Sequence, residues 1–506
     1  MISFSSSRRR FIASTGAWIG ASAIGFGLSS KNTRTISLLH TTDLHGHIVP
    51  TQTYGGVKDL GGLARCATRI RQWRAENPDN LLVDIGDVYQ GTPESLANNG
   101  NLMIDLFNAL DYDAWVLGNH DFDWGPQALA HNLARSQSPV LTANLTIDGK
   151  PTGGLPGPWG KVRPWMIREI AGFRIALIGL ITPGLPYWLT PGTLGPAAPV
   201  DPVETLRKII PDVHAANPDA IVLLTHMGWR ERGDDYANPL KKIIENTPGI
   251  DALLAGHSHR DQPSWEINDT LCSQASYYGI NCGKLDLTFD TKTRKLIGKR
   301  AITELMDHQV ALDPAVMKLA APEINKSEKR LSRQLGTVTQ TITERGNDAT
   351  LAPFLCKAFA TALKNNGTPV DGVFHGTFGT GDIPAGPITE RDCWKYLPYE
   401  NLLTTAEITG AEIIEICRHS YGRILWPFIL ELDSDGNPTR IELNGKPVSK
   451  DTRYTIAFNS YDAQSGGKRL MKLREILSHP ASKRKTHLID TRTALIETIK
   501  ERKQIP

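Results

Sequence analysis

The chain has 506 residues, of which 40% are hydrophobic and 22% charged, with a formal net charge of +3 at pH 7. This length predicts two or three globular domains of about 150 residues each, and the composition excludes collagen, a disordered chain and a membrane bundle. Apart from three arginines at 8–10 the charges balance, so nothing favours a nucleic acid as partner.

The first thirty residues read as a targeting segment. The arginines at 8–10 are followed by Phe11 and Ile12, and then by a weakly apolar stretch rich in Ala, Gly and Ser without an acidic residue. This pattern resembles the twin-arginine export signal. We therefore expect residues 1–30 to direct export and the mature chain to be periplasmic or secreted, without a stable membrane span.

From about residue 35 to 301 the sequence alternates short apolar runs with polar clusters and helical stretches, which predicts a layered α/β domain over 34–310. The runs lie at 36–42, 81–87, 114–120, 139–145, 174–182, 220–226 and 250–257. Almost every run ends in a carboxylate, an amide or an imidazole. Because ligands bind beyond the carboxyl ends of strands in α/β sheets, we expect these polar side chains to converge.

The pattern of apolar and charged residues changes after residue 301. Residues 313–334 read as a charged helix without a strand partner, so we take 311–335 as a linker helix. Short strands, a helix around 350–364 and the turn-rich HGTFGTGDIPAG follow, a pattern that predicts a second, α+β domain over 336–506.

The polar residues at the strand ends form a set with metal-ligand chemistry. Their motifs are DxH, GD, GNHD, an isolated His and GHxH, and their candidate ligands are Asp43, His45, Asp87, Asn119, His226, His257 and His259. Carboxylate, amide and imidazole ligands suit Mn, Zn, Fe or Co better than Ca. Seven ligands are enough for two adjacent divalent ions if one carboxylate bridges them. The sequence therefore predicts two divalent metal ions whose identity stays open.

These motifs, in this order, resemble those of the calcineurin-like metallophosphoesterases, and GNHDFDWG is similar to the version in the bacterial periplasmic 5'-nucleotidase and UDP-sugar hydrolase group. The resemblance implies a four-layer α/β/β/α metallophosphoesterase domain followed by a smaller α+β 5'-nucleotidase C-terminal domain. It also implies two metal sites, one formed by Asp43, His45, Asp87 and His259, and one by Asp87, Asn119, His226 and His257. Asp87 would bridge them.

The chemistry expected of such a centre is hydrolysis by a metal-bridged hydroxide. Two ions roughly 3.5 to 4 Å apart lower the pKa of a shared water and hold a phosphoryl oxygen. His120 follows the ligand Asn119 and, by the resemblance, would stabilise the developing charge or protonate the leaving oxygen. Asp123 would orient that imidazole and raise its pKa.

The second domain resembles the one that binds the nucleoside in this family. SYDAQSGG is similar to a signature in which an aromatic residue precedes a glycine pair, so Tyr461 would stack on a base. Trp426 or Phe428 would then face it across the base.

Two departures bear on the substrate. Where the family commonly has NGGGIR this chain has HGTFGT, so His375 stands for Asn and Thr380 for a substrate-binding Arg. Thr cannot supply the paired hydrogen bonds of a guanidinium. Lys468 and Arg469 follow the glycine pair in place of an acidic residue, either near an anionic ligand or exposed.

We therefore expect an exported two-metal phosphohydrolase acting on 5'-nucleotides or related small-molecule phosphoesters. One alternative keeps the metal centre but acts on a non-nucleotide phosphoester, a 2',3'-cyclic nucleotide or a sulfur-linked substrate. Another is a catalytically silent binding protein. The sequence leaves the oligomeric state open.

Overall fold

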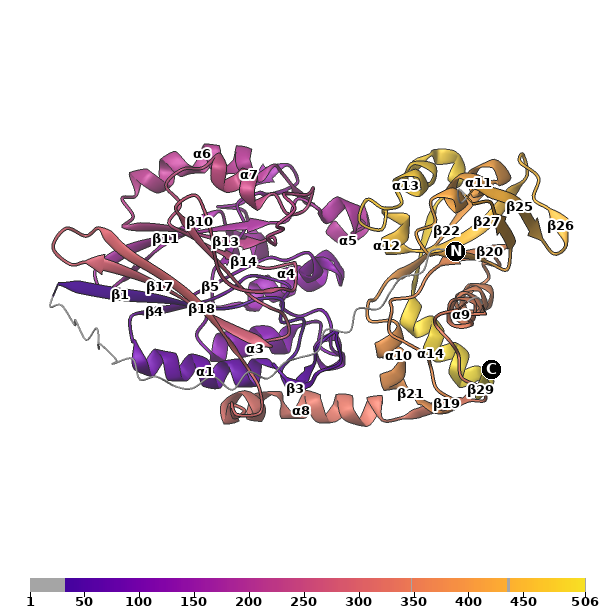
Figure 1. The fold of residues 1–506 in the computed structure, drawn as a ribbon, viewed down its shortest axis with the longest axis horizontal. Coiled ribbons are helices and arrows are strands. Elements are labelled where there is room, and N and C mark those ends of the chain that lie inside the picture. The colour runs from indigo at the N-terminus through magenta and orange to yellow at the C-terminus, as the bar shows by residue number, and fades with distance from the viewer. Residues whose placement is uncertain (1–31, 347, 435–436, 506) are drawn as a thin grey trace, which may run out of the picture.

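The computed structural model describes residues 32–346, 348–434 and 437–505. These residues form two bodies joined by a long helix, α8 (Pro314–Leu331) (Figure 1). The export signal expected at 1–30 lies outside the described residues. Across the described ranges, we find no helix with the length and apolar character needed to cross a membrane.

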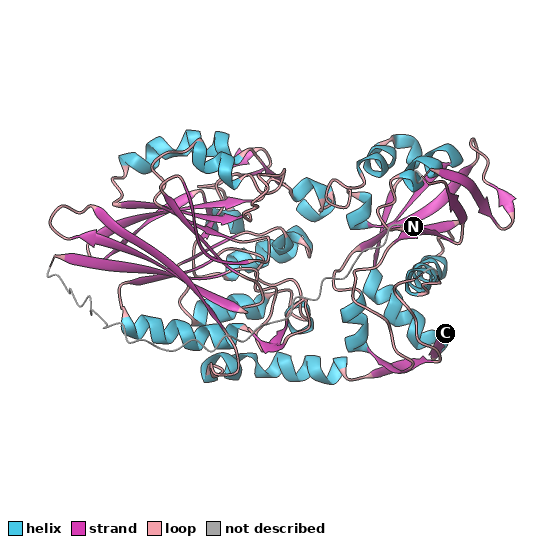
Figure 2. Ribbon diagram, in the orientation of Figure 1, coloured by secondary structure: helices cyan, strands magenta, loops and turns pink. Residues whose placement is uncertain are grey.

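The first body contains two large sheets that face each other (Figure 2). One runs in the order β18 (Leu296–Leu305), β17 (Asn281–Asp290), β1 (Thr33–Thr41), β4 (Asn80–Asp84), β5 (Ala114–Val116), β6 (Val140–Leu141) and β9 (Val162–Arg163). The other runs in the order β10 (Trp165–Ile170), β11 (Phe173–Ile181), β13 (Ala220–His226), β14 (Ala252–Ala255), β16 (Thr270–Ala275) and β15 (Asp261–Ile267).

Helices cover the outer face of each sheet. Helices α1 (Leu63–Glu76) and α3 (Asn101–Ala109) cover the first sheet, and α6 (Pro202–Ala215) and α7 (Leu240–Glu245) cover the second. Strand β1 explains the layering, because Leu38 packs in the core between the sheets while Leu39 packs beneath α1. Strands buried on both faces require nearly continuous apolar runs. The predicted four-layer α/β/β/α architecture is confirmed.

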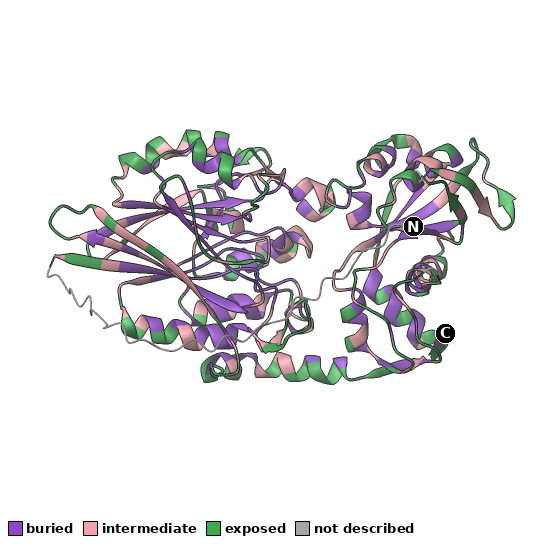
Figure 3. Ribbon diagram, in the orientation of Figure 1, coloured by how far each residue is buried: buried purple, intermediate pink, exposed green. Residues whose placement is uncertain are grey.

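The second body is a smaller α+β unit. Its main sheet runs in the order β23 (Ile424–Trp426), β20 (Gly372–His375), β27 (Arg453–Asn459), β22 (Leu402–Thr409) and β28 (Lys485–Asp490). Helices α9 (Leu351–Asn365) and α14 (Thr491–Arg502) pack on one face, and α11 (Gly410–Arg418) and α13 (Met471–Ser478) on the other. Figure 3 shows the resulting pattern, with buried sheets and helices that expose one side. This unit confirms the α+β fold expected for the second half.

Helix α8 is anchored to the first body. The Asp313 side chain accepts the backbone N–H groups of Ala315 and Val316 at 2.9 Å each, which caps the helix start. Val316 and Ala320 then pack into the core beneath α1.

Shorter elements complete both bodies. They include the hairpin of β2 (Thr51–Gln52) and β3 (Lys58–Leu60), the 3-10 turns η1 (His120–Phe122) and η3 (Leu185–Tyr187), and the helix α12 (Ser460–Ala463).

Candidate metal centre and adjoining cavity

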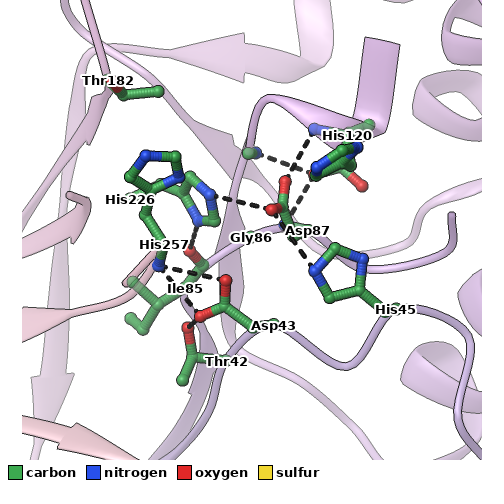
Figure 4. Close-up of polar contacts among 12 residues, drawn as sticks. Thr42, Asp43, His45, Ile85, Gly86, Asp87, His120, Thr182, His226 and His257 are labelled. Carbon is green, nitrogen blue, oxygen red and sulfur yellow. Dashed lines mark hydrogen bonds and ion pairs between the residues drawn. The ribbon is translucent and has the colours of Figure 1, made fainter. Parts of the chain in front are cut away.

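The predicted metal ligands lie at the carboxyl ends of strands from both sheets (Figure 4). Asp43 and His45 follow β1, Asp87 follows β4, Asn119 follows β5, His226 ends β13, and His257 and His259 follow β14. Parallel pairing aligns these ends within each sheet, with Thr41 opposite Asp84 and Ile181 opposite His226. Because the two sheets face each other, these aligned ends also meet across the sheets. The His257 N–H, for example, donates to the Asp43 carboxylate, although the two residues lie more than two hundred positions apart in the chain.

Six of these side chains form two groups that share one carboxylate. Ligand atoms within each group lie within 4.8 Å of one another, in the sets Asp43, His45, Asp87, His259 and Asp87, His226, His257. Oδ2 of Asp87 lies 3.2 Å from Nε2 of His226 and 3.6 Å from Nε2 of His45. Asp87 therefore occupies the position of a bridge between two cation sites.

Buried polar atoms without partners show that the residues fit such cations. Oδ2 of Asp87 and Oδ1 of Asn119 are buried and accept no hydrogen bond from the described residues. A buried acceptor left unsatisfied costs about 1–3 kcal/mol. Both atoms lie where a divalent cation would satisfy them, and the donor set of carboxylate, amide and imidazole suits Mn, Zn, Fe or Co.

Hydrogen bonds set the orientation of the imidazoles. Nδ1 of His45 lies 2.8 Å from the carbonyl oxygen of Gln90, and Nδ1 of His226 lies 2.6 Å from that of Ile85. A carbonyl only accepts, so each Nδ1 carries a hydrogen and each Nε2 is the nitrogen that faces Asp87.

The charge state of these rings follows from their surroundings. Burial lowers the pKa of His45 to about 3 and that of His257 to about 3, which keeps both rings neutral and able to bind a metal. Burial also acts to lower the pKa of His226, but the Asp87 carboxylate outweighs it and raises that pKa to about 9.

The backbone at the centre is strained. Five of the candidate ligands have positive φ angles, namely Asp43 (49°), His45 (48°), Asp87 (55°), His257 (69°) and His259 (54°). Non-glycine residues in this left-handed region cost of order 1–3 kcal/mol each and persist only where surrounding structure enforces them. Here the enforcement is local, since the N–H of His257 donates to both carboxylate oxygens of Asp43 at 3.0 Å.

His120 lies between the metal ligands and a cavity. Its backbone N–H donates to Oδ1 of Asp87 at 2.7 Å, and its Nδ1 lies 2.7 Å from Oδ2 of Asp123. Burial opposes protonation of this ring, but Asp123 and Asp87 outweigh burial and raise the pKa of His120 to about 10. The ring stacks on Tyr399, with centroids 5.4 Å apart. The structure thus pairs His120 with Asp123 beside the centre.

A cavity of about 610 Å³ opens from this point between the two bodies. The first body contributes His120, Asp123, Trp188 and His257 to its walls, and the second contributes His375, Phe378, Tyr399, Arg423, Tyr461 and Arg469.

The three predicted base-stacking residues do not come together. Tyr461 lines the cavity, and its hydroxyl accepts a hydrogen bond from Nη2 of Arg469 at 3.0 Å. Trp426 ends β23 on the face that packs against α9, and it lines a separate shallow pocket. Phe428 is 8% exposed and packs in the core with Tyr454. The interpretation that Trp426 or Phe428 faces Tyr461 is corrected, because the side-chain alternation of β23 and the burial of Phe428 turn both rings away from the cavity.

Tyr399 and Phe378 also line the cavity, although the sequence did not predict them there. Their rings lie 5.9 Å apart, and both stand in irregular segments next to strands rather than in a periodic pattern. The aromatic residue in the run KYLPYENLL, directly before β22, was the available signal for Tyr399.

The residues at which this chain departs from the family pattern lie in different surroundings. Lys468 does not line the cavity, and its Nζ lies 4.3 Å from the ring centroid of Tyr187 and 4.5 Å from that of Tyr236 in the first body. Arg469 lines the cavity. Thr380 adds no cation, and its backbone N–H donates to Glu344.

The two bodies are held together on both sides of the cavity. On one side the backbone N–H of Gly467 and the hydroxyl of Ser465 donate to the carbonyl of Tyr187 at 3.3 and 3.1 Å. On the other side the carboxylate of Glu400 accepts from Gln90 at 3.0 Å and from Trp124 at 3.3 Å. Because Glu400 is the neighbour of Tyr399, the second contact fixes the segment that stacks on His120.

Comparison with known proteins adds two family matches. The profile of the calcineurin-like phosphoesterases matches residues 36–261, and that of the 5'-nucleotidase C-terminal domain matches residues 332–475.

Individual relatives and a solved structure match between about half and nearly all of the chain. The chain is 26% identical over 477 residues to a 2',3'-cyclic-nucleotide 2'-phosphodiesterase/3'-nucleotidase of Haemophilus influenzae, covering 82% of this chain and 72% of that protein. It is 30% identical over 305 residues to a snake venom 5'-nucleotidase of Naja atra, but this match covers 56% of this chain and 55% of that protein. The crystal structure of a 5'-nucleotidase precursor from Thermus thermophilus shares the fold, with a TM-score of 0.71, 24% identity and coverage of 94% and 97% of the two chains.

Proposed function

Because the chain belongs to the calcineurin-like phosphoesterases and carries a 5'-nucleotidase C-terminal domain, we propose that it is a two-metal phosphohydrolase that releases phosphate from 5'-nucleotides or related phosphoesters. The observation that carries the proposal is the shared carboxylate of Asp87, which belongs to both groups of ligand atoms and keeps Oδ2 free of hydrogen bonds from the described residues. A carboxylate in that position serves two cations at once.

We assign the ligands as two overlapping sets. Asp43, His45, Asp87 and His259 would hold one ion, and Asp87, Asn119, His226 and His257 would hold the other. When bound, two divalent ions lower the pKa of a shared water and polarise a phosphoryl oxygen, so that no covalent enzyme intermediate is required.

The residues around the centre supply positioning and a proton. Asp123 holds Nδ1 of His120 at 2.7 Å, which leaves Nε2 of the protonated ring as the donor to the leaving oxygen of the substrate. The same positive charge stabilises negative charge that develops in the transition state. Asp87 fixes the backbone of His120, so the proton donor and the cation sites keep a constant separation.

The aromatic side chains that line the cavity and the positive charge of Arg469 support a nucleotide as substrate. Tyr399, Phe378 and Tyr461 line the cavity that begins at His120, and stacking on such rings is worth about 1–3 kcal/mol per base. Arg469 bonds to the Gly466 carbonyl and the Tyr461 hydroxyl, and no carboxylate in the described ranges lies within ion-pair distance of it. Its charge therefore remains for an anionic substrate. Arg423, by contrast, is paired with Asp462 at 2.7 Å.

The relatives point to the same substrate class, since their names are those of a cyclic-nucleotide phosphodiesterase/3'-nucleotidase and of 5'-nucleotidases. The decisive experiment is a hydrolysis panel on metal-loaded protein with nucleoside mono-, di- and triphosphates, cyclic nucleotides, UDP-sugars, sugar phosphates and p-nitrophenyl phosphate. Preference for nucleotides supports the proposal. Hydrolysis of p-nitrophenyl phosphate without any nucleotide preference favours a non-nucleotide phosphoester, and failure to bind metal or turn over any substrate favours a silent binding protein.

We also propose export of the chain and a division into domains. The pair of arginines before Phe11 and Ile12 supports a twin-arginine-type signal over 1–30 and a periplasmic or secreted location. Boundaries at 34–310, 311–335 and 336–506 follow the change in sequence pattern. Cell fractionation with and without an Arg8, Arg9 double substitution to Lys tests the export route.

A further inference from the structure

The hydroxyl of Tyr54 contacts one of the proposed metal ligands. Its Oη lies 2.8 Å from Nδ1 of His259. On the opposite side of the same imidazole, Nε2 lies 3.3 Å from Oδ1 of Asp43 and 3.1 Å from Nε2 of His45. The ring thus turns one nitrogen toward the cation site and the other toward Tyr54.

This contact completes a pattern shared by three ligand imidazoles. In His45 and His226 the ring nitrogen remote from Asp87 bonds to a backbone carbonyl, at 2.8 and 2.6 Å. His259 has no such carbonyl among the described residues, and the Tyr54 hydroxyl occupies the equivalent place. Nε2 of His259 can bind a cation only if Nδ1 carries the hydrogen, so the hydroxyl must accept it.

The Tyr54 hydroxyl is placed to accept the hydrogen bond from Nδ1 of His259. Oη of Tyr54 lies 3.1 Å from Oη of Tyr278, which allows the Tyr54 hydrogen to point at Tyr278 and the Tyr54 lone pair to point at His259. The neighbouring rings hold this geometry. Tyr54 stacks on Tyr277 with centroids 4.6 Å apart, and its backbone N–H donates to the Tyr277 hydroxyl at 3.0 Å.

We propose that Tyr54 is a positioning residue that fixes the tautomer and orientation of His259 and thereby strengthens one of the two metal sites selectively. The inference rests on the proposed dinuclear centre. Tyr54 lies outside the five motifs that contain the proposed ligands. It lies on the segment between β2 and β3 and is 64% exposed, so the metal site that contains His259 depends on a surface segment. The carbonyls that orient His45 and His226 belong instead to buried residues.

Metal titration of the metal-free protein tests this role without relying on activity. Zn²⁺ or Mn²⁺ is added to wild type and to Tyr54→Phe, and the two binding constants are measured by calorimetry. Tyr54→Phe keeps the ring stacking and removes only the hydroxyl. Loss of an outer hydrogen bond to a metal ligand lowers metal affinity about 10–100-fold, so one constant should fall by that factor while the other stays at the wild-type value.

Two further variants separate positioning from general damage to the segment. Thr53→Val removes the hydrogen bond from the Val57 N–H to the Thr53 hydroxyl, which supports the same turn without touching His259, and should leave both constants unchanged. Tyr278→Phe leaves the Tyr54–His259 contact in place and should weaken the same site by a smaller factor than Tyr54→Phe.

The outcomes are distinguishable from failure of the proposed centre. If wild type binds two equivalents and Tyr54→Phe matches it at both sites, Tyr54 does not position His259. Equal weakening by Tyr54→Phe and Thr53→Val assigns the effect to the segment as a whole and also overturns the inference. If wild type binds fewer than two equivalents, the dinuclear centre itself is wrong, and the inference falls with it.

Discussion

The backbone N–H of His120 donates a 2.7 Å hydrogen bond to Oδ1 of Asp87, so the shared carboxylate and the proposed proton donor are directly joined. The other oxygen of Asp87 faces His226 and His45. One side chain therefore sets both the spacing of the cation sites and the place of the acid, and its loss affects both.

Replacing Asp87 with Asn should deplete both metal sites, because a bridging carboxylate neutralises two ions at once. Elemental analysis after dialysis should find well under one equivalent of metal per chain. The comparison variant is His259→Asn, which removes a ligand from one site only and should leave about one equivalent. Retention of two equivalents and normal turnover by Asp87→Asn would show that the carboxylate is not a bridge.

Replacing His120 with Asn should leave both metals bound while turnover falls by a factor on the order of 100 to 10,000, the usual contribution of a positioned proton donor. The loss should be smaller on p-nitrophenyl phosphate, whose leaving group departs without much protonation. Metal content and kcat on a good and a poor leaving group are the measurements. An equal loss on both substrates would assign His120 to charge stabilisation instead.

Replacing Asp123 with Asn should shift the pH profile. The Asp123 carboxylate is the first of the groups that raise the pKa of His120 above its usual value, so its removal lowers that pKa. The acid form is active below its pKa, and the alkaline limb of the kcat profile should move to lower pH while metal content stays constant. An alkaline limb at the wild-type position would mean that Asp123 does not control the ionisation of His120.

Replacing Tyr461 with Ala should weaken nucleotide binding by about 1–3 kcal/mol and leave p-nitrophenyl phosphate hydrolysis nearly unchanged. KM values for a nucleotide and for the small substrate give the comparison. Trp426→Ala is the matched aromatic control, since Trp426 lies outside the cavity and should not alter either KM. Parallel loss on both substrates would make Tyr461 a structural residue.

The metal ligands could be predicted from the sequence because each stands in a short motif at the end of an apolar run. Asp43 and His226 are far apart in the chain and belong to different sheets. The rule that ligands bind beyond the carboxyl ends of strands in α/β folds still predicts that both face one site. The layered fold followed from the same runs.

The cavity residues could not be predicted in the same way. Trp426 and Phe428 were reasonable aromatic candidates, but the face that a short strand presents depends on which helix packs against it. Tyr399 reaches His120 only through the docking of one body on the other, and Tyr54 reaches His259 from a segment without periodicity. Contacts that arise from domain docking or from irregular loops leave no local pattern.

The left-handed backbone at five ligand positions has a consequence for the engineering of this chain. Glycine adopts such angles without steric cost, so His259→Gly should relieve strain and raise the melting temperature of the metal-free protein while destroying the site. A screen for thermostable variants that measures only folding would therefore favour variants that have lost the metal site.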